Sequence, residues 1–405
     1  MSASTLEVAD IFRAQGQVWR QVHAGHISLA QLKVMSAIEA CRSAALGGHV
    51  LRCSSCEHQQ IAYNSCRNRH CPKCQGSASH RWLEARQADL LPVEYYHLVF
   101  TLPAPISDLA YSNQSVIYTI LFKTAAKTLQ TIAADPKHLG ARLGLTLVLH
   151  TWGSAMTHHP HVHGIVPGGG VSPDGKRWVH CKSGFFLPVR VLSRLFRRLF
   201  LARLVQAYQA GELKFFGEQQ SLVNATAFAD WLKPMKQIDW VVYAKRPFAG
   251  PEAVLAYLSR YTHRVAISNS RLLSFNEQGV TFKWKDYRCK QQSRYKTMTL
   301  KTDEFIRRFL IHVLPGGFHR IRHYGLLANA RRQDNLKRAR ALLIDNSDDE
   351  EDSENGAIVG AELNDTSEDI LATFICPDCG SPMVIIECFG REQLPRAPPA
   401  RIIAI

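Results

Sequence analysis

The chain has 405 residues, enough for two or three domains with a sizeable hydrophobic core. Its formal net charge is +15, and eleven of its carboxylates fall within residues 345–369. The remaining 49 basic and 23 acidic residues leave a net charge of +26, which favours a polyanionic partner over a merely solvated basic surface. The sequence lacks a run of about 18 apolar residues and an N-terminal signal pattern, which argues against a membrane protein and predicts a cytoplasmic location.

The N-terminal part is expected to be helical and then to bind a metal. Residues 1–48 have the apolar spacing of helices. Two C-x-x-C knuckles follow, fourteen residues apart, and their spacing fits one structural zinc ribbon with four ligands: Cys53, Cys56, Cys71 and Cys74. Disulfides are the alternative, but adjacent C-x-x-C pairs in a chain without a secretory signal suit a metal better. Three nearby residues could replace a ligand or form a second site: Cys66, His58 and His70.

The loop between the knuckles is basic. It carries Arg67 and Arg69, and Lys73 lies just beyond Cys71. We expect this loop, fixed at both ends by the bound metal, to contact phosphates through these cations. A helix over Ala78–Leu91 then leads into the next domain.

The run His161-Val162-His163 places two imidazoles on the same face of a predicted strand, because successive side chains of a strand alternate between faces. Residues 144–152 are predicted to be the preceding strand of a hairpin. If the pairing centres between Ala155 and Met156, His150 lies opposite His161 on that same face. Three imidazoles could then hold a divalent ion and leave part of its shell open. Ordinary surface or core histidines are the alternative for such a motif taken alone.

Residues 170–176 match most of a P-loop, but Arg177 occupies the Ser/Thr position and a turn leads to a strand-like segment. We therefore predict a hairpin there rather than a nucleotide site. Further strands are expected at about 95–102, 161–166, 238–244 and 280–285, and long helices at about 104–134 and 189–210. This mixture predicts an α+β fold, with helices packed on an antiparallel sheet.

Residues 251–264 carry helix signals, with Pro251 and Glu252 early and Arg264 late. Tyr257 and Tyr261 are spaced i, i+4, so they share one face of that helix. Two core tyrosines would have the same spacing. Together with a histidine pair that could bind a metal, however, the two tyrosines are better interpreted as nucleophiles. A tyrosyl oxygen would attack a phosphodiester and conserve the energy of the broken bond in a phosphotyrosine.

The C-terminal third holds three further features. A basic segment with Arg331, Arg338 and Arg340 is predicted to be a helix, and the acidic stretch after it is low in complexity and expected to be disordered. Cys376-Pro377-Asp378-Cys379 resembles half of another knuckle. Only Cys388 follows it, and the sequence offers no obvious fourth ligand.

Together these segments resemble the IS91 family of transposases, whose catalytic domain belongs to the two-tyrosine HUH (His-hydrophobic-His) nucleases. The resemblance covers most of residues 5–330. Besides the His-x-His run and the tyrosine helix, it is carried by Tyr96–Pro103, Val166–Gly170, Trp240–Phe248, Val280–Arg288 and Leu314–Gly325.

The resemblance implies a DNA transposase that cuts and rejoins single-stranded DNA by a rolling-circle-like route, with Mg²⁺ or Mn²⁺ at the catalytic site. It implies metal ligation by His161 and His163, nucleophilic roles for Tyr257 and Tyr261, a central His-x-His strand, and action at the bacterial nucleoid. His150 rests more on the hairpin argument. We also expect Arg260 and Arg264, on the tyrosine helix, to contact DNA.

Two alternatives remain open at this point. A plasmid replication initiator or relaxase would use the same chemistry, although such proteins often carry a helicase. A non-catalytic zinc-ribbon DNA-binding regulator would have no use for the tyrosine pair.

The expected organisation is an N-terminal helical and zinc-ribbon domain (1–92), an antiparallel-sheet HUH nuclease domain (93–325), a basic helix (326–344), an acidic disordered linker (345–370) and a C-terminal C-x-x-C segment (371–405).

Overall fold

The computed structural model describes residues 6–87, 89–182, 184, 186–245, 265–286, 295–345 and 374–396. The described chain forms two compact units. Of the described residues, one unit contains 7–74 together with 374–396, and the other contains Leu6 and those between 75 and 345. None of the described helices has the length and apolar character needed to cross a membrane.

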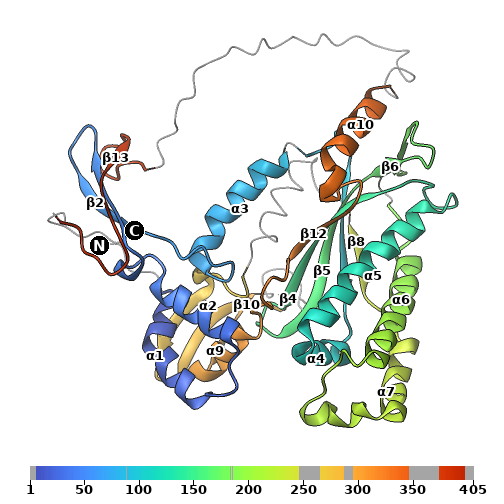
Figure 1. Cartoon of the computed structure of the whole chain (residues 1–405), viewed down its shortest axis with the longest axis horizontal. Coiled ribbons are helices and arrows are strands. Elements are labelled where there is room, and N and C mark those ends of the chain that lie inside the picture. The colour runs from blue at the N-terminus through green and yellow to red at the C-terminus, as the bar shows by residue number, and fades with distance from the viewer. Residues whose placement is uncertain are drawn as a thin grey trace. The chain divides into compact units, whose positions relative to one another are not determined.

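The smaller unit packs two helices beside a three-stranded antiparallel sheet. Helices α1 (Val8–Val22) and α2 (Leu29–Ala40) each begin with a capping box, and they bury apolar side chains such as Phe12 and Met35. The sheet has the order β13-β1-β2, formed by β1 (Gly48–Cys53), β2 (Gln59–Tyr63) and β13 (Met383–Phe389). Figure 1 shows the red β13 beside the blue strands of the N-terminal region. The C-terminal segment, expected to be a separate part of the chain, is therefore the third strand of this domain.

The larger unit is built on a five-stranded antiparallel sheet of order β12-β4-β5-β3-β8. Its strands are β3 (Tyr95–Thr101), β4 (Gly144–Trp152), β5 (His158–Pro167), β8 (Val242–Lys245) and β12 (Ile321–Gly325). The predicted α+β class is confirmed. The His-x-His strand, β5, lies at the centre of the sheet, as the resemblance implied.

Helices cover one face of this sheet. They are α4 (Ala104–Ser112), α5 (Gln114–Ala134), α6 (Val189–Gln209) and α7 (Ala225–Gln237), and Figure 1 shows α5 and α6 along one side of the strands. Alternate strand residues, among them Leu98, Leu149 and Val162, point into this core. Their neighbours in sequence must then point to the opposite face, which carries the histidines.

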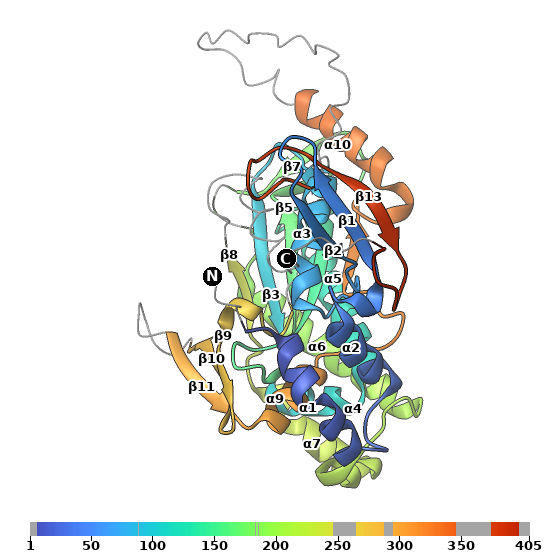
Figure 2. The same cartoon turned by 90° about the vertical axis from the view of Figure 1, so that its left-hand side faces the viewer.

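The opposite face is covered at one end by α3 (Pro72–Gln87) and α10 (Arg332–Asp345), which pack Trp82 and Leu336 against Ile165. A second antiparallel sheet has the order β11-β10-β9, from β9 (Leu272–Asn276), β10 (Gly279–Lys285) and β11 (Tyr295–Leu300), and its strands lie side by side in Figure 2. Helix α9 (Thr302–Leu310) packs on it through Phe305 and Phe282.

Two details refine the predicted elements. The helix expected over 104–134 is divided at Asn113, whose backbone leaves the helical region and whose side chain bonds Leu109 O, Lys214 O and Lys214 N. The P-loop-like run is a hairpin, as predicted: β6 (Gly169–Val171) pairs with β7 (Trp178–His180) through the turn at Gly175.

Candidate metal centres and active site

The β4–β5 hairpin brings three histidines together on the face of the sheet opposite α5 and α6. His150 pairs directly with His161, which confirms the register predicted from the turn. The candidate ligand nitrogens of His150, His161 and His163 all lie within 4.8 Å of one another. His150 and His163 are buried, whereas His161 is partly exposed. Among the three, His161 is therefore the most exposed to solvent.

The hairpin tip is held by the second sheet and by α9. The turn closes through Gly153 N to Thr157 O at 2.9 Å, with Met156 at a φ of 56°. Lys285 N donates to Ser154 Oγ at 2.6 Å, and Arg308 Nη1 donates to Ala155 O at 3.2 Å. These contacts fix the tip, and a fixed tip sets the register that places His150 opposite His161.

Hydrogen bonds select which nitrogen each histidine can offer to a metal. His161 Nδ1 lies 2.6 Å from the carbonyl oxygen of His159, so Nδ1 donates and Nε2 keeps its lone pair. His163 Nδ1 lies 2.8 Å from His97 Nε2. If His163 ligates through Nε2, its Nδ1–H must donate to His97 Nε2, which then takes the place of the carboxylate, carbonyl or water that usually accepts this hydrogen bond.

Burial keeps the rings of His161 and His97 neutral. It lowers the pKa of His161 to about 4, and it lowers the pKa of His97 to about 4 with a smaller contribution from the charge of Lys245. Neutral imidazole is the metal-binding form. The donor set therefore suits a divalent ion at neutral pH.

Not every histidine of the run 158–163 belongs to this cluster. His158 points into the protein, where Nδ1 donates to Ser107 O and Nε2 bonds the Tyr118 hydroxyl at 2.8 Å. Its pKa is lowered to about 4 by burial. His158 is thus a core histidine, whereas the alternating positions 161 and 163 face the site.

The predicted nucleophiles, Tyr257 and Tyr261, lie outside the described residues, and so do Arg260 and Arg264. The structure thus bears only on the metal ligands of the predicted active site. The roles of the two tyrosines as nucleophiles and of the two arginines as DNA contacts stay predictions.

The smaller unit contains two separate groups of four cysteines, which corrects the predicted single ribbon. Cys71 and Cys74 lie with Cys41 and Cys66, whereas Cys53 and Cys56 lie with two cysteines of the C-terminal segment, Cys376 and Cys379. The spacing of two C-x-x-C pairs along the chain identified ligands, but each pair finds its partners elsewhere in the fold.

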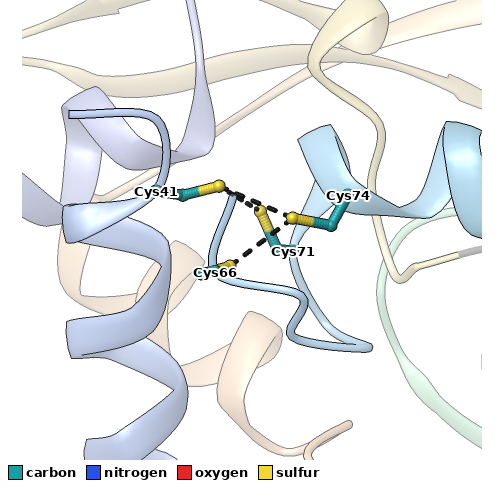
Figure 3. Close-up of side chains that lie close together, drawn as sticks. All are labelled: Cys41, Cys66, Cys71 and Cys74. Carbon is teal, nitrogen blue, oxygen red and sulfur yellow. Dashed lines mark hydrogen bonds between the residues drawn. The ribbon is translucent and has the colours of Figure 1, made fainter. Parts of the chain in front are cut away.

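Figure 3 shows the first group, with the four thiols turned toward one another. Cys41 ends α2, and Cys71 and Cys74 lie at the start of α3. The Sγ atoms of Cys41 and Cys74 are 3.5 Å apart, and those of Cys66 and Cys74 are 3.6 Å apart. A zinc–sulfur distance of about 2.3 Å gives a tetrahedron with edges of about 3.8 Å, so the group has nearly the size of a zinc site. Hydrogen bonds from the other three thiols lower the pKa of Cys74 and favour its thiolate.

The three residues that could have replaced a zinc ligand, Cys66, His58 and His70, have different surroundings. Cys66 is a member of the first group, as the sequence allowed. His58 instead lies 2.7 Å from a carboxylate oxygen of Asp378, and His70 belongs to neither group. Cys41 was missed because it lies within residues 1–48, which were predicted to be helical, and has no C-x-x-C partner. Cys388 lies against His49, at 3.2 Å from Nδ1.

The predicted phosphate contacts are unequal. Arg67 is exposed on the loop before the second knuckle, with a φ of 51°. Burial lowers the pKa of Arg69. Lys73 lies 2.7 Å from the Glu7 carboxylate, which largely satisfies its charge within the domain. Arg67 is therefore the most available cation of the three.

A second basic feature lies on the helical side of the larger unit. A groove of about 1050 Å³ runs along α6, with Arg194, Arg197, Arg198 and Lys236 among its lining residues. Because α6 covers the face of the sheet opposite the three histidines, this groove is not part of the histidine cluster.

Comparisons with known proteins agree with these features. Residues 144–334 match the family described as "Putative transposase" (Y2_Tnp), and residues 11–102 match the family described as "Transposase zinc-binding domain" (Zn_Tnp_IS91). The chain is 57% identical over 343 residues to "Putative transposase y4qJ" of Sinorhizobium fredii (strain NBRC 101917 / NGR234), covering 85% of each protein. It is 27% identical over 321 residues to "Transposase for insertion sequence element IS801" of Pseudomonas savastanoi pv. phaseolicola, covering 77% of this chain and 74% of the relative.

One solved structure is also similar, the conjugative relaxase TrwC in complex with OriT DNA, in a metal-free form. The alignment covers 62% of this chain and 73% of that chain, at 11% identity and a TM-score of 0.21. A TM-score this low does not establish a shared fold.

Proposed function

This chain belongs to the IS91 family of transposases, and we propose on that basis that it cuts and rejoins single-stranded DNA through a 5′-phosphotyrosine intermediate. Tyr257 and Tyr261 are the proposed nucleophiles. His150, His161 and His163 are the proposed ligands of a divalent ion, Mg²⁺ or Mn²⁺. The observation that carries the proposal is the convergence of these three imidazoles on one face of the central strands.

The three imidazoles can hold a divalent ion and leave room for the substrate. Three imidazoles leave part of the coordination shell for a phosphate oxygen, and the low pKa of His161 keeps its ring neutral at cellular pH. An ion held there would polarise the scissile phosphate and favour the unprotonated tyrosine, whose free pKa is about 10. The protein's own part is to fix the three rings through the hairpin register and the His97 hydrogen bond.

The proposed cleavage is an in-line exchange of one phosphoester for another. The tyrosyl oxygen attacks phosphorus, the bond to the 3′ oxygen breaks, and that oxygen takes up a proton and leaves as a 3′ hydroxyl. The 5′ phosphate stays on the tyrosine, and a later attack by a 3′ hydroxyl rejoins the DNA and frees the tyrosine. Because the phosphotyrosine conserves the energy of the broken bond, no ATP is required. Two tyrosines would let one residue hold a strand while the other makes the next cut.

The same chemistry would serve a replication initiator or a relaxase. Family membership favours transposition. The P-loop-like run at residues 170–176 leads into strand β7 of a hairpin, not into the helix that a nucleotide-binding loop requires. A non-catalytic DNA-binding regulator would bind the element ends without forming a covalent adduct.

The decisive experiment incubates the protein and Mn²⁺ with labelled single-stranded oligonucleotides from the ends of its own element. We expect a covalent protein–DNA adduct that resists denaturing electrophoresis. Changing both Tyr257 and Tyr261 to Phe should abolish the adduct and leave DNA binding intact, because Phe removes only the attacking oxygen. His161→Ala should abolish cleavage without loss of zinc from the smaller unit. An adduct in the double Phe variant would refute the assignment of the nucleophile, and binding with no adduct in the wild type would favour the regulator.

A further inference from the structure

We propose that Cys53, Cys56, Cys376 and Cys379 form a second structural zinc site, which fastens the C-terminal segment of the chain to the N-terminal domain. Two ligands precede the catalytic unit in the sequence and two follow it. The matched zinc-binding family model ends at residue 102, so it does not include the second pair. The inference does not depend on the proposed phosphotyrosine chemistry.

The sulfur positions fit a metal and do not fit disulfides. The Sγ atoms of Cys53 and Cys379 are 3.4 Å apart, and those of Cys56 and Cys376 are 3.6 Å apart. A disulfide bond would bring two sulfurs to about 2.05 Å. Zinc tetrahedrally coordinated by four thiolates places them about 3.8 Å apart. All four sulfurs lie within 4.8 Å of one another, so a single ion can reach them all.

The two C-x-x-C pairs have the same backbone geometry, although one lies near each end of the chain. Cys53 N donates to His58 O at 2.8 Å, and Cys376 N donates to Ser381 O at 2.8 Å, in both cases to the carbonyl five residues ahead. The residue after the second cysteine is left-handed in both: Glu57 has a φ of 56° and Gly380 a φ of 74°. Two matching turns that present paired thiols to a common point are what a four-cysteine zinc ribbon requires.

Other contacts join the two knuckles directly. Ser54 N and Ser54 Oγ both donate to Pro382 O, at 3.1 and 3.0 Å. His58 Nδ1 lies 2.7 Å from the Asp378 carboxylate. Polar contacts therefore join the two knuckles in addition to the thiol group.

The strand that follows the second knuckle continues the same attachment. β13 pairs antiparallel with β1 from Cys53↔Met383 to Gly48↔Phe389. Leu51, Cys53, Cys376 and Met383 form a small buried cluster, and Phe389 packs with Val50 and Ile61 in another. Such small clusters bury little apolar surface, and domains with small cores commonly depend on metals for stability. The site therefore has a structural task, which is to hold a strand that arrives from more than 300 residues away along the chain.

The first test is zinc stoichiometry of the full-length protein by inductively coupled plasma mass spectrometry. We expect two equivalents in the wild type and one in the double variant Cys376→Ser/Cys379→Ser. A matched control, Cys388→Ser, removes a C-terminal thiol that belongs to neither group and should keep two equivalents. One equivalent in the wild type, or two in the double variant, would overturn the proposal.

A second test leaves every ligand in place, so that it does not depend on how well the double variant folds. A protease site is introduced into the acidic segment between residues 350 and 365, and the zinc-loaded protein is cut there. We expect the C-terminal fragment to elute with the rest of the protein in size-exclusion chromatography, and to separate when zinc is removed with a chelator. Separation in the presence of zinc, or continued association after zinc is removed, would refute a zinc-dependent attachment. The adduct assay reports the catalytic proposal separately.

Discussion

Replacing His97 tests whether the hydrogen bond behind His163 tunes the metal site. His97 is buried, and its Nε2 lies 2.8 Å from His163 Nδ1. In His97→Leu, the Nδ1–H of a metal-bound His163 loses its acceptor. His97→Gln is the matched variant, because its amide oxygen can still accept that hydrogen bond.

The size of the effect follows from this single contact. Leaving a buried donor without its partner costs about 1–3 kcal/mol, and about 1.4 kcal/mol corresponds to a tenfold change in affinity. Loss of such outer hydrogen bonds generally weakens metal binding about 10- to 100-fold. We therefore expect Mn²⁺ to bind His97→Leu about 10- to 100-fold more weakly than the wild type, and His97→Gln to recover most of the loss.

The assay is a titration of Mn²⁺ followed by electron paramagnetic resonance of the free ion, with zinc content measured in the same samples. The zinc content should stay constant, because His97 belongs to neither of the two cysteine groups. Equal Mn²⁺ affinity in the wild type and His97→Leu would show that the reasoning about His163 is wrong. Equal weakening in the Leu and Gln variants would point to packing rather than to the hydrogen bond.

Three further predictions concern stability, zinc and DNA. Hydrogen bonds from Arg307 and Arg308 lower the pKa of Glu304 to about 2. The ionised carboxylate therefore stabilises the folded protein fully above the pKa of the unfolded chain, about 4.3, and this stabilisation is lost as the pH falls toward 2. Glu304→Gln should therefore lower the thermal midpoint at pH 7 and flatten its pH dependence between about 4.5 and 2; a slope like that of the wild type would contradict this. Cys71→Ser should remove one equivalent of zinc and leave the catalytic unit folded by circular dichroism, and unchanged zinc content would reject the first cysteine group. Binding of single-stranded DNA should weaken with salt, with a log–log slope of about −0.7 per phosphate contact, whereas a flat response would exclude the basic surfaces as DNA contacts.

Short-range patterns in the sequence were sufficient to predict the histidine cluster. The alternation of a strand placed His161 and His163 on one face, and the length of the turn placed His150 opposite. Both are local properties of fewer than twenty residues. The sheet class and the hairpin at residues 169–180 could be predicted for the same reason.

The cysteine pairing could not be predicted in this way. A C-x-x-C knuckle specifies two ligands and a turn, but it carries no information about which other pair completes the tetrahedron. The group of Cys53 and Cys56 is completed by two cysteines more than 300 positions away along the chain. The group of Cys71 and Cys74 is completed by Cys41 and Cys66. Only the tertiary fold brings these groups together. The break at Asn113 was missed for a related reason, since its side chain bonds the distant backbone of Lys214.

The pairing of β13 with β1 has a consequence for how the protein is made. The ribosome produces β1 and β2 before β13, and one edge of β1 stays without its partner until residues 383–389 emerge. At about 5–20 residues per second, the 320 residues between Cys56 and Cys376 take about 15 to 65 s to synthesise. During that interval the nascent chain exposes an open strand edge, which is a common starting point for wrong pairing between chains. A transposase that lacked residues 376–389 would keep that edge exposed, so the zinc-binding domain is completed only after the catalytic unit has been synthesised.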